Sequence, residues 1–237
     1  MRTEVAAAQR IVIKLGTRVV THDDGRLALS RLYAVVEAAA ALRRAGRDVL
    51  IVSSGAVGLG IEALAFDQRP TELADLQACA TVGQSRLMST YREGFSRLDV
   101  VCGQVLLTQS DFDDRDRYLN LRATLLALLR RGVVPVINEN DAVATEELRF
   151  LPGEERPVFG DNDGLSALVA TKLGAALLIL LTDVDGLHAR DPRTDPTAPM
   201  LHTWEREEVD AGAGSSLGRG GMGSKLAAAL VASKSGC

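Results

Sequence analysis

Residues 10–17 have the sequence Arg-Ile-Val-Ile-Lys-Leu-Gly-Thr, an apolar run that contains one lysine and ends at a glycine. Such a run predicts a buried strand at Arg10–Leu15, closed by the glycine and threonine. The next stretch, Leu27–Ala45, has apolar residues at helical spacing, and Gly46 is suited to end a helix. A second strand is predicted at Asp48–Val52. This order of strand, helix and strand indicates a parallel α/β sheet.

The same alternation continues along the chain and predicts a mostly parallel central sheet. The predicted helices are Leu27–Ala45, Thr71–Phe95, Arg117–Arg131, Gly164–Leu173 and Lys225–Ser233, and the predicted strands are Arg10–Leu15, Asp48–Val52, Val100–Leu107, Val133–Ile137 and Ala176–Leu181. A polar turn is predicted at Ser110–Asp116, and two strand-like segments, 146–150 and 156–159, flank an expected hairpin loop at 151–155. No linker or repeat divides the chain, so we expect one domain.

Polar and glycine residues follow four of the predicted strands at the point where each strand ends. These segments are residues 14–17, 53–55, 138–141 and 182–183. In open α/β sheets ligands bind outside the carboxyl ends of the strands. We therefore expect these four segments to form one site.

Composition excludes several classes of protein. The 237 residues are 46% hydrophobic, and 27 basic against 31 acidic residues give a net charge of −4, so the chain can form a core but lacks the basic surface that nucleic acids require. The longest apolar run, residues 175–181, is too short to span a membrane, and we expect a cytoplasmic protein. The three cysteines and three histidines are scattered, which argues against disulfides and predicts no metal site built from protein side chains.

Lysine is rare in this chain. Four lysines stand against 23 arginines, so arginine is the ordinary surface cation. Lys14 lies near the end of an apolar strand, where a charge needs a partner unless the side chain extends to the surface. Lys225 lies where a glycine-rich segment becomes a helix, a position that disfavours a cation unless an anion binds there. Both lysines stand where a phosphate could bind.

The glycine-rich segment 212–223 has two alternative interpretations. Its residues 214–218 fit the G-x-S-x-G pattern of hydrolases, but no strand precedes them and no histidine follows. The order Gly223-Ser224-Lys225 is not a Walker A loop either. Backbone N–H groups before a helix still suit a phosphate, and a surface connection explains the same sequence equally well. Similarly, Asp161 or Asn162 could serve as a helix cap rather than as a site residue.

Seven motifs occur in the order found in the amino-acid kinase family, and together they resemble that family from about residue 10 to residue 237. They are Ile13-Lys14-Leu15-Gly16-Thr17, Val52-Ser53-Ser54-Gly55-Ala56, Val82-Gly83-Gln84-Ser85-Arg86, the segment 134–141, Gly160-Asp161-Asn162-Asp163, Leu181-Thr182-Asp183 and the segment 220–225. The resemblance implies a three-layer α/β/α sandwich with a mostly parallel central sheet. It also implies transfer of the ATP γ-phosphoryl group to the side-chain carboxylate of L-glutamate, the first step of proline biosynthesis.

The resemblance also implies roles for individual residues. Lys14 and Lys225 resemble the lysines that neutralise the transferring phosphoryl group, and Asp163 the aspartate that orients them. The implied glutamate contacts are Ser54, Asp141 and Asn162, with Asn138 close by, and Asp141 suits the α-ammonium group. The implied nucleotide contacts are Lys14, Gly16, Gly55, Thr182, Asp183, Gly220, Gly221, Met222, Gly223, Ser224 and Lys225, with phosphate oxygens meeting the N–H groups of Gly16 and Gly55. Mg²⁺ is expected on the ATP phosphates, L-proline as a feedback inhibitor, and copies of the chain as a homo-oligomer.

The sequence departs from the family pattern at two places. The stretch Phe150–Val158 is longer than in the shortest members, and the chain stops at Cys237, where the family continues into a closing strand and often a small PUA-type domain. We therefore expect a kinase domain over residues 1–237 that lacks its closing strand and any PUA-type domain. The alternatives are a homologue that binds ATP or amino acid without turnover, and a kinase for N-acetylglutamate, aspartate or carbamate.

Overall fold

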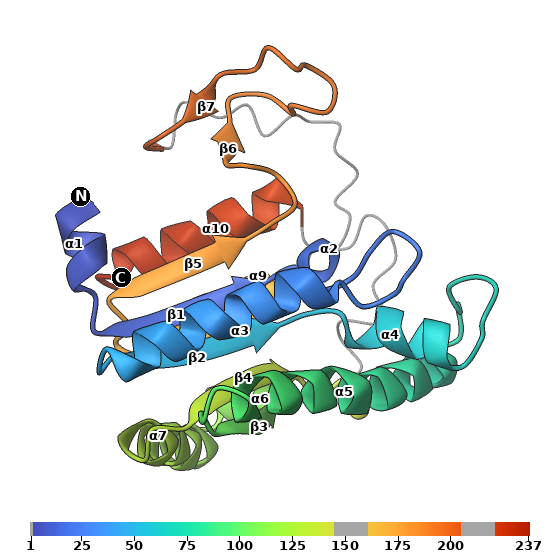
Figure 1. The fold of residues 1–237 in the computed structure, drawn as a ribbon, viewed down its shortest axis with the longest axis horizontal. Coiled ribbons are helices and arrows are strands. Elements are labelled where there is room, and N and C mark those ends of the chain that lie inside the picture. Colours follow the sequence, from blue (N-terminus) through green and yellow to red (C-terminus); the bar gives the residue numbers. More distant parts are fainter. Residues whose placement is uncertain (1, 145–160, 205–220) are drawn as a thin grey trace.

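The computed structural model describes residues 2–144, 161–204 and 221–237. Its centre is a five-stranded sheet in the order β3-β4-β2-β1-β5, in which every pair of neighbours is parallel. The strands are β1 (Arg10–Leu15), β2 (Asp48–Ser53), β3 (Cys102–Leu107), β4 (Val134–Glu139) and β5 (Leu177–Leu181). Figure 1 shows them side by side with β1 and β2 in the middle.

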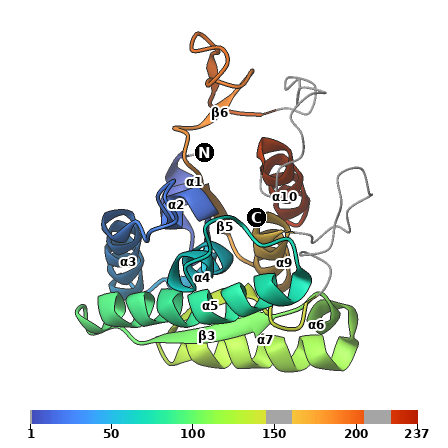
Figure 2. The same ribbon diagram turned by 90° about the vertical axis from the view of Figure 1, so that its right-hand side faces the viewer.

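Helices cover both faces of this sheet, which confirms the predicted three-layer α/β/α arrangement (Figure 2). One face packs against α3 (Leu29–Arg44) and α5 (Leu73–Ser96), and the other packs against α7 (Arg115–Arg130) and α9 (Asn162–Leu173). The last helix, α10 (Met222–Lys234), packs beside α9. The remaining elements are α1 (Arg2–Ala7), α2 (Thr17–Val20), α4 (Ala56–Ala63), α6 (Ser110–Asp113), β6 (Leu187–His188) and β7 (Met200–Leu201).

The alternation of side chains along β1 decides which way its lysine points. Ile11, Ile13 and Leu15 belong to the core under α3 and α5, whereas Val12 belongs to the core under α7 and α9. Because successive side chains of a strand point to opposite faces, Lys14 lies on the same face as Val12. The strand therefore directs its one charged interior side chain toward α9.

Helices α4 and α5 cross with almost no space between their backbones. A Cβ atom at Gly60 would lie 1.7 Å from the carbonyl oxygen of Cys79, and one at Gly83 would lie 1.8 Å from that of Ala56. Both positions therefore require glycine. The contact joins the segment that follows β2 to the middle of α5.

Most predicted elements are confirmed, with ends that shift by one to three residues. The polar turn predicted at Ser110–Asp116 is wrong, because α6 occupies its first part and Asp114 caps α7 by accepting a hydrogen bond from Arg117 N at 2.8 Å. Helices α1, α2 and α4 and the β6–β7 pair were not predicted. The predicted segments 146–150 and 156–159, the hairpin loop between them, and most of the glycine-rich segment lie outside the described residues.

Candidate active site

The carboxyl ends of the strands bring together side chains from β1, α9 and α10. Lys14 comes from β1, Asp163 from the first turn of α9, and Lys225 from the first turns of α10. Asp161 fixes the start of α9 as its N-cap, because its Oδ1 accepts a hydrogen bond from Gly164 N at 2.9 Å. This is one of the two capping residues that the sequence suggested. The cap places Asp163 opposite the end of β1.

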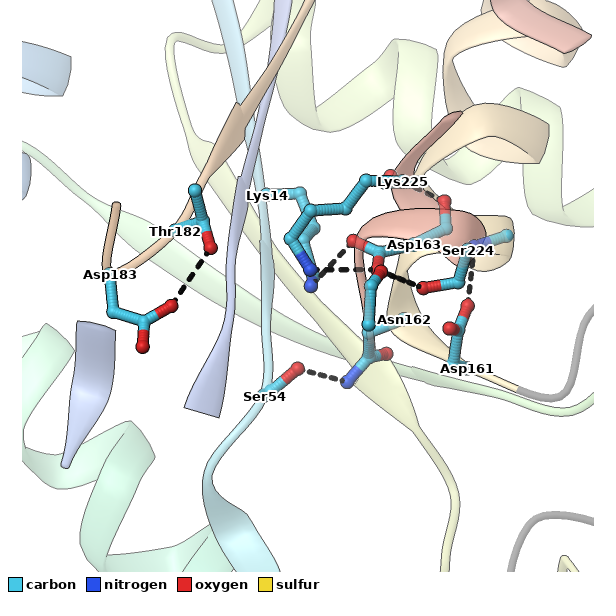
Figure 3. A network of polar contacts seen from close by, with 12 residues as sticks. Lys14, Ser54, Asp161, Asn162, Asp163, Thr182, Asp183, Ser224 and Lys225 are labelled. Atoms are coloured by element: carbon cyan, nitrogen blue, oxygen red, sulfur yellow. Dashed lines mark hydrogen bonds and ion pairs between the residues drawn. The ribbon is translucent and has the colours of Figure 1, made fainter. Parts of the chain in front are cut away.

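Lys14, Asp163 and Lys225 form a buried cluster, here called the Lys–Asp–Lys cluster (Figure 3). The Nζ atom of Lys14 lies 2.6 Å from Asp163 Oδ1, and the Nζ atom of Lys225 lies 3.2 Å from Asp163 Oδ2. Asp163 is fully buried, and the residues Lys14 and Lys225 are only 3% and 8% exposed. The surface-lysine alternative for Lys14 is therefore excluded, and one carboxylate holds two ammonium groups side by side.

The hydroxyl group of Ser224 completes this arrangement. Its Oγ atom lies 2.8 Å from Asp163 Oδ2 and 2.8 Å from the carbonyl oxygen of Gly221, so its single proton serves one of the two acceptors at a time. Burial alone raises the pKa of Asp163, but the charge and hydrogen bond of Lys14, the charge of Lys225 and the Ser224 hydrogen bond outweigh burial and lower it. Asp163 is therefore an ionised acceptor and not a general base.

Burial has the opposite consequence for Lys14. Loss of solvation, together with the neighbouring charge of Lys225, lowers the pKa of the Lys14 ammonium, although Asp163 and Asp161 act in the other direction. An additional anion close to the Lys–Asp–Lys cluster would offset this cost. The cluster is therefore electrostatically suited to receive a phosphoryl group.

A chain of side-chain amides runs from α5 to the turn after β2, and we call Gln84, Asn138, Asn162 and the Ser54 hydroxyl the amide chain. Asn138 Nδ2 donates to Gln84 Oε1 at 2.8 Å. Asn162 Nδ2 donates both to Asn138 Oδ1 at 2.9 Å and to Ser54 Oγ at 3.0 Å. The structure thus brings together Ser54, Asn138 and Asn162, three of the residues that the sequence assigned to glutamate.

Two buried oxygen atoms near this site have neither a hydrogen-bond partner nor an ion-pair partner within the described part of the chain. They are Oδ1 of Asn162 and Oδ2 of Asp161. Buried acceptors are normally satisfied, because an unmet acceptor costs about 1–3 kcal/mol. Both atoms are therefore suited to accept hydrogen bonds from a bound molecule or its water.

Two features fix the conformation of the turn after β2. Tyr91 is fully buried, and its hydroxyl donates to Ser53 Oγ at 2.9 Å. Burial raises the pKa of Tyr91, so the group stays a neutral donor. Gly55 has φ = +107°, and a Cβ atom there would lie 2.9 Å from Val20 Cγ1. Only glycine fits this position, and it allows Ser54 to face α9.

Thr182 and Asp183 lie apart from the Lys–Asp–Lys cluster, as Figure 3 shows. Thr182 Oγ1 donates to Asp183 Oδ1 at 3.1 Å, and Asp183 Oδ2 accepts from Arg18 at 3.1 Å and from Arg193 at 2.6 Å. Burial raises the pKa of Asp183, but hydrogen bonds from Arg18, its own backbone and Thr182, with the charge of Arg193, outweigh burial and lower it. Thr182 and Asp183 thus form a separate polar cluster after β5, and their predicted contact with the nucleotide stays a prediction.

The glycines predicted to contact the nucleotide differ in their surroundings. Gly16 N donates to the carbonyl oxygen of Leu181 at 3.3 Å, so the N–H group that we predicted to meet a phosphate has another partner. Gly221 is the N-cap of α10, and Met222 and Gly223 form its first turn together with Ser224. Gly220 lies outside the described residues.

Asp141 is 9% exposed and borders a cleft of about 340 Å³ between α5 and the ends of β3 and β4. Gln84, Arg92 and Glu139 also line this cleft. Asp141 therefore approaches the site from the side of β4, while Ser54 and Asn162 approach it from β2 and α9.

Four residues that contact these side chains had no predicted role. Gln84 and Tyr91 support the amide chain and the Ser54 turn, and Arg18 and Arg193 hold Asp183. A signal existed for Gln84 alone, because a glutamine stands on the otherwise apolar face of a predicted helix. The two arginines gave none, since arginine is the common cation of this chain.

Residues 9–237 match the pattern of the amino acid kinase family. The chain therefore belongs to the amino acid kinase family.

Three curated relatives are each named glutamate 5-kinase. Those of Herminiimonas arsenicoxydans and Janthinobacterium sp. (strain Marseille) are 46% identical to the chain over 241 residues. That of Cupriavidus metallidurans is 46% identical over 244 residues. In each comparison the match includes the whole of this chain and 62% of the relative, so the chain spans less than two thirds of the length of these proteins.

Proposed function

We propose that the chain is the kinase domain of a glutamate 5-kinase, which phosphorylates the side-chain carboxylate of L-glutamate with ATP. The Lys–Asp–Lys cluster is the observation that carries this proposal, because two buried ammonium groups share one carboxylate at the edge where the strands end. The similarity to relatives with that name supports the choice of substrate. We also propose that residues 1–237 form a single amino acid kinase domain.

The chemistry explains why cations, and not a base, dominate the site. An oxygen of the glutamate side chain attacks the γ-phosphorus of ATP, a new O–P bond forms, and the bond to the β,γ-bridging oxygen breaks to release ADP. The attacking carboxylate is already ionised, so no proton has to be removed. Positioning and neutralisation of negative charge are then the main requirements. Lys14 and Lys225 supply the charge, and Asp163 holds both ammonium groups at fixed positions.

The nucleotide is proposed to bind between Thr182 and Asp183 on one side and the start of α10 on the other. Gly221, Met222, Gly223 and Ser224 suit the phosphates because the first N–H groups of a helix point outward. We also propose that Gly220 and Gly55 contact the nucleotide.

Mg²⁺ would be held mainly by the phosphates and would neutralise part of their negative charge. The unpartnered Oδ2 of Asp161 is suited to accept a hydrogen bond from a metal-bound water. The charge of Asp161 also favours the ammonium form of Lys14 by raising its pKa. Within residues 2–144, 161–204 and 221–237, no three His, Cys, Asp or Glu side chains are grouped so as to hold a metal ion.

L-Glutamate is proposed to bind against Ser54, Asn138, Asn162 and Asp141. Asp141 is suited to the α-ammonium group because it is a largely buried carboxylate. L-Proline shares the α-ammonium and α-carboxylate pair with glutamate, and we propose that it inhibits by competing for this site. Titration of proline into glutamate saturation curves tests this, because competition raises the apparent KM for glutamate. Indifference to saturating proline would contradict it.

The decisive experiment measures ADP release that depends on glutamate, with hydroxylamine to trap the acyl phosphate as a hydroxamate. We expect both products with L-glutamate and none with N-acetyl-L-glutamate, which lacks the α-ammonium charge. Equal rates with both acids would overturn the proposal. Failure to turn over any acid, with nucleotide binding retained, would favour a homologue that binds without catalysis.

We further propose that the protein works in the cytoplasm and as a homo-oligomer. Consumption of ATP supports the cytoplasmic location, and cell fractionation tests it. Light scattering on the purified chain tests the second. No helix in the described parts of the chain is both long and apolar enough to cross a membrane.

A further inference from the structure

We propose that Gln84 is a positioning residue that fixes the direction of the amide chain, and thereby makes the site selective for a substrate with an ammonium group beside a carboxylate. The inference rests on the proposed function, because it concerns how the same site distinguishes L-glutamate from other acids. Gln84 itself touches neither the Lys–Asp–Lys cluster nor Ser54; it acts through Asn138 and Asn162.

The geometry of the amide chain is continuous and largely buried. Gln84 and Asn138 are 8% and 3% exposed. The three successive distances, from Gln84 to Asn138, from Asn138 to Asn162 and from Asn162 to Ser54, are 2.8, 2.9 and 3.0 Å. All are within normal hydrogen-bond range. Because each asparagine offers one oxygen and one NH₂ group, the orientation of one amide decides that of the next.

Two directions of this chain are chemically possible. In the structure Gln84 presents its oxygen, so Asn138 donates to Gln84 and accepts from Asn162. If Gln84 presented its NH₂ group instead, Asn138 would turn over, and Asn162 would have to present its oxygen to Asn138. The terminal amide of Gln84 therefore selects between two arrangements of the site.

The observed direction leaves a defined pattern at the open end. The NH₂ group of Asn162 donates to Asn138 and Ser54, and its Oδ1 is buried without a partner in the described part of the chain. Ser54 Oγ accepts from Asn162, so its own hydroxyl proton remains to be donated. The open end of the amide chain thus presents one acceptor, Asn162 Oδ1, which suits an ammonium group. It also presents one donor, the Ser54 hydroxyl group, which suits a carboxylate. The reversed direction would remove this match.

The experiment compares Gln84→Met with Gln84→Glu in the complete chain. Methionine has a similar length but no acceptor for Asn138, so the amide chain is no longer restricted to one direction. A glutamate carboxylate keeps an acceptor toward Asn138 and preserves the direction, but it adds a negative charge to the cleft that Glu139 and Asp141 also line. Gln104→Met is the matched control, since Gln104 is exposed and lines the same cleft without joining the amide chain.

The readouts are KM and kcat for L-glutamate, KM for ATP, and the ratio of kcat/KM for L-glutamate over glutarate, which has no ammonium group. For Gln84→Met we expect KM for glutamate to rise roughly tenfold, as for loss of one buried hydrogen-bond partner. The preference over glutarate should fall, while KM for ATP stays at the wild-type value. Gln104→Met should keep both KM for glutamate and the preference, and Gln84→Glu, which keeps the acceptor, should keep the preference.

Each outcome bears on the inference. If Gln84→Glu loses the preference over glutarate as Gln84→Met does, or if Gln84→Met resembles the control, the inference is wrong while the proposed function stands. If the wild-type chain shows no glutamate-dependent turnover, the proposed function fails and the inference fails with it. Should Gln84→Met not fold, the Gln84→Glu variant decides alone, because loss of its preference for glutamate over glutarate contradicts the role of direction.

Discussion

The ammonium group of Lys14 lies 2.6 Å from the carboxylate of Asp163, although the two residues belong to β1 and α9. The alternation along β1 and the cap at Asp161 produce this contact, since one directs Lys14 toward α9 and the other fixes where α9 begins. The pair is almost inaccessible to solvent. Its formation therefore depends on packing of the complete domain.

Lys14→Arg should fold but lose activity. The guanidinium group keeps the charge but is planar and broader than an ammonium, so it cannot occupy the same place beside Lys225. We expect kcat to fall roughly 10²–10³-fold, as for removal of one group that stabilises transition-state charge. Lys172→Arg, on the far end of α9 over the Tyr118 ring, is the control and should keep wild-type kcat. ADP-release kinetics measure both, and normal turnover by Lys14→Arg would contradict the role of Lys14.

Asp163→Asn and Lys14→Met should change stability in different ways. Asp163→Asn leaves two buried ammonium groups without their carboxylate, and we expect the free energy of unfolding to fall by about 3–5 kcal/mol. Lys14→Met removes a charge whose burial lowers its pKa, and Asp163 keeps Lys225 and Ser224. Its melting temperature should equal or exceed that of the wild type while activity is lost. Urea and thermal unfolding test both, and equal destabilisation would refute this account.

Acid should weaken the fold partly through Asp163. Its pKa in the folded protein is lowered, so its contribution to stability is complete above the ordinary aspartate value of about 3.9 and is lost as pH falls through the folded pKa. The difference in unfolding free energy between wild type and Asp163→Asn should therefore be constant near neutrality and shrink in strong acid. Urea titrations at several pH values measure it. A difference that grows on acidification would contradict the assignment.

Gly60→Ala should disrupt the crossing of α4 and α5. The new Cβ atom would lie 1.7 Å from the Cys79 carbonyl oxygen, so the two helices would have to separate. Gly58→Ala, in the same helix with nothing within 4 Å, is the control and should be neutral or stabilising by up to about 1 kcal/mol, because alanine favours helix. Thermal melts compare them. Similar melting temperatures for the two variants would show that the helices are not in close contact.

His188 should make the β6–β7 hairpin sensitive to pH. Its two ring nitrogens lie 2.9 Å from the Ala198 carbonyl oxygen and 2.8 Å from Asp185 Oδ1, and these acceptors raise its pKa. Its stabilising contribution is complete below the ordinary value of about 6.5 and is lost as pH rises through the folded pKa. The protection of residues 185–201 from hydrogen exchange, after correction for the intrinsic rise of exchange with pH, should fall over that range in the wild type. His188→Leu should exchange rapidly throughout, and a wild-type profile from it would exclude this role.

The sequence predicted the central sheet because each strand is a short apolar run bounded by polar residues or glycine. It also predicted Lys14 and Lys225 as site residues from their rarity and position. It failed at α4, where glycines at 58 and 60 weaken the helical pattern, yet the structure needs Gly60 for a close backbone contact. The role of Gln84 could not be predicted, because it depends on hydrogen bonds between residues far apart in the sequence. The hydrogen bond of the Gly16 N–H group could not be predicted for the same reason, because its acceptor is Leu181 of β5.

The glycine contact between α4 and α5 has a consequence for motion. Ser54 precedes α4, and Gln84 lies on α5 next to Gly83, so both ends of the amide chain belong to elements whose backbones touch. Their separation cannot change without parting those backbones. Asn162 and Asp163, by contrast, are carried by the first turn of α9, and Lys225 by α10 beside it. The spacing of Ser54 and Gln84 is therefore set by contact between two helix backbones, whereas the positions of Asn162 and Asp163 are set by the packing of α9 in the core.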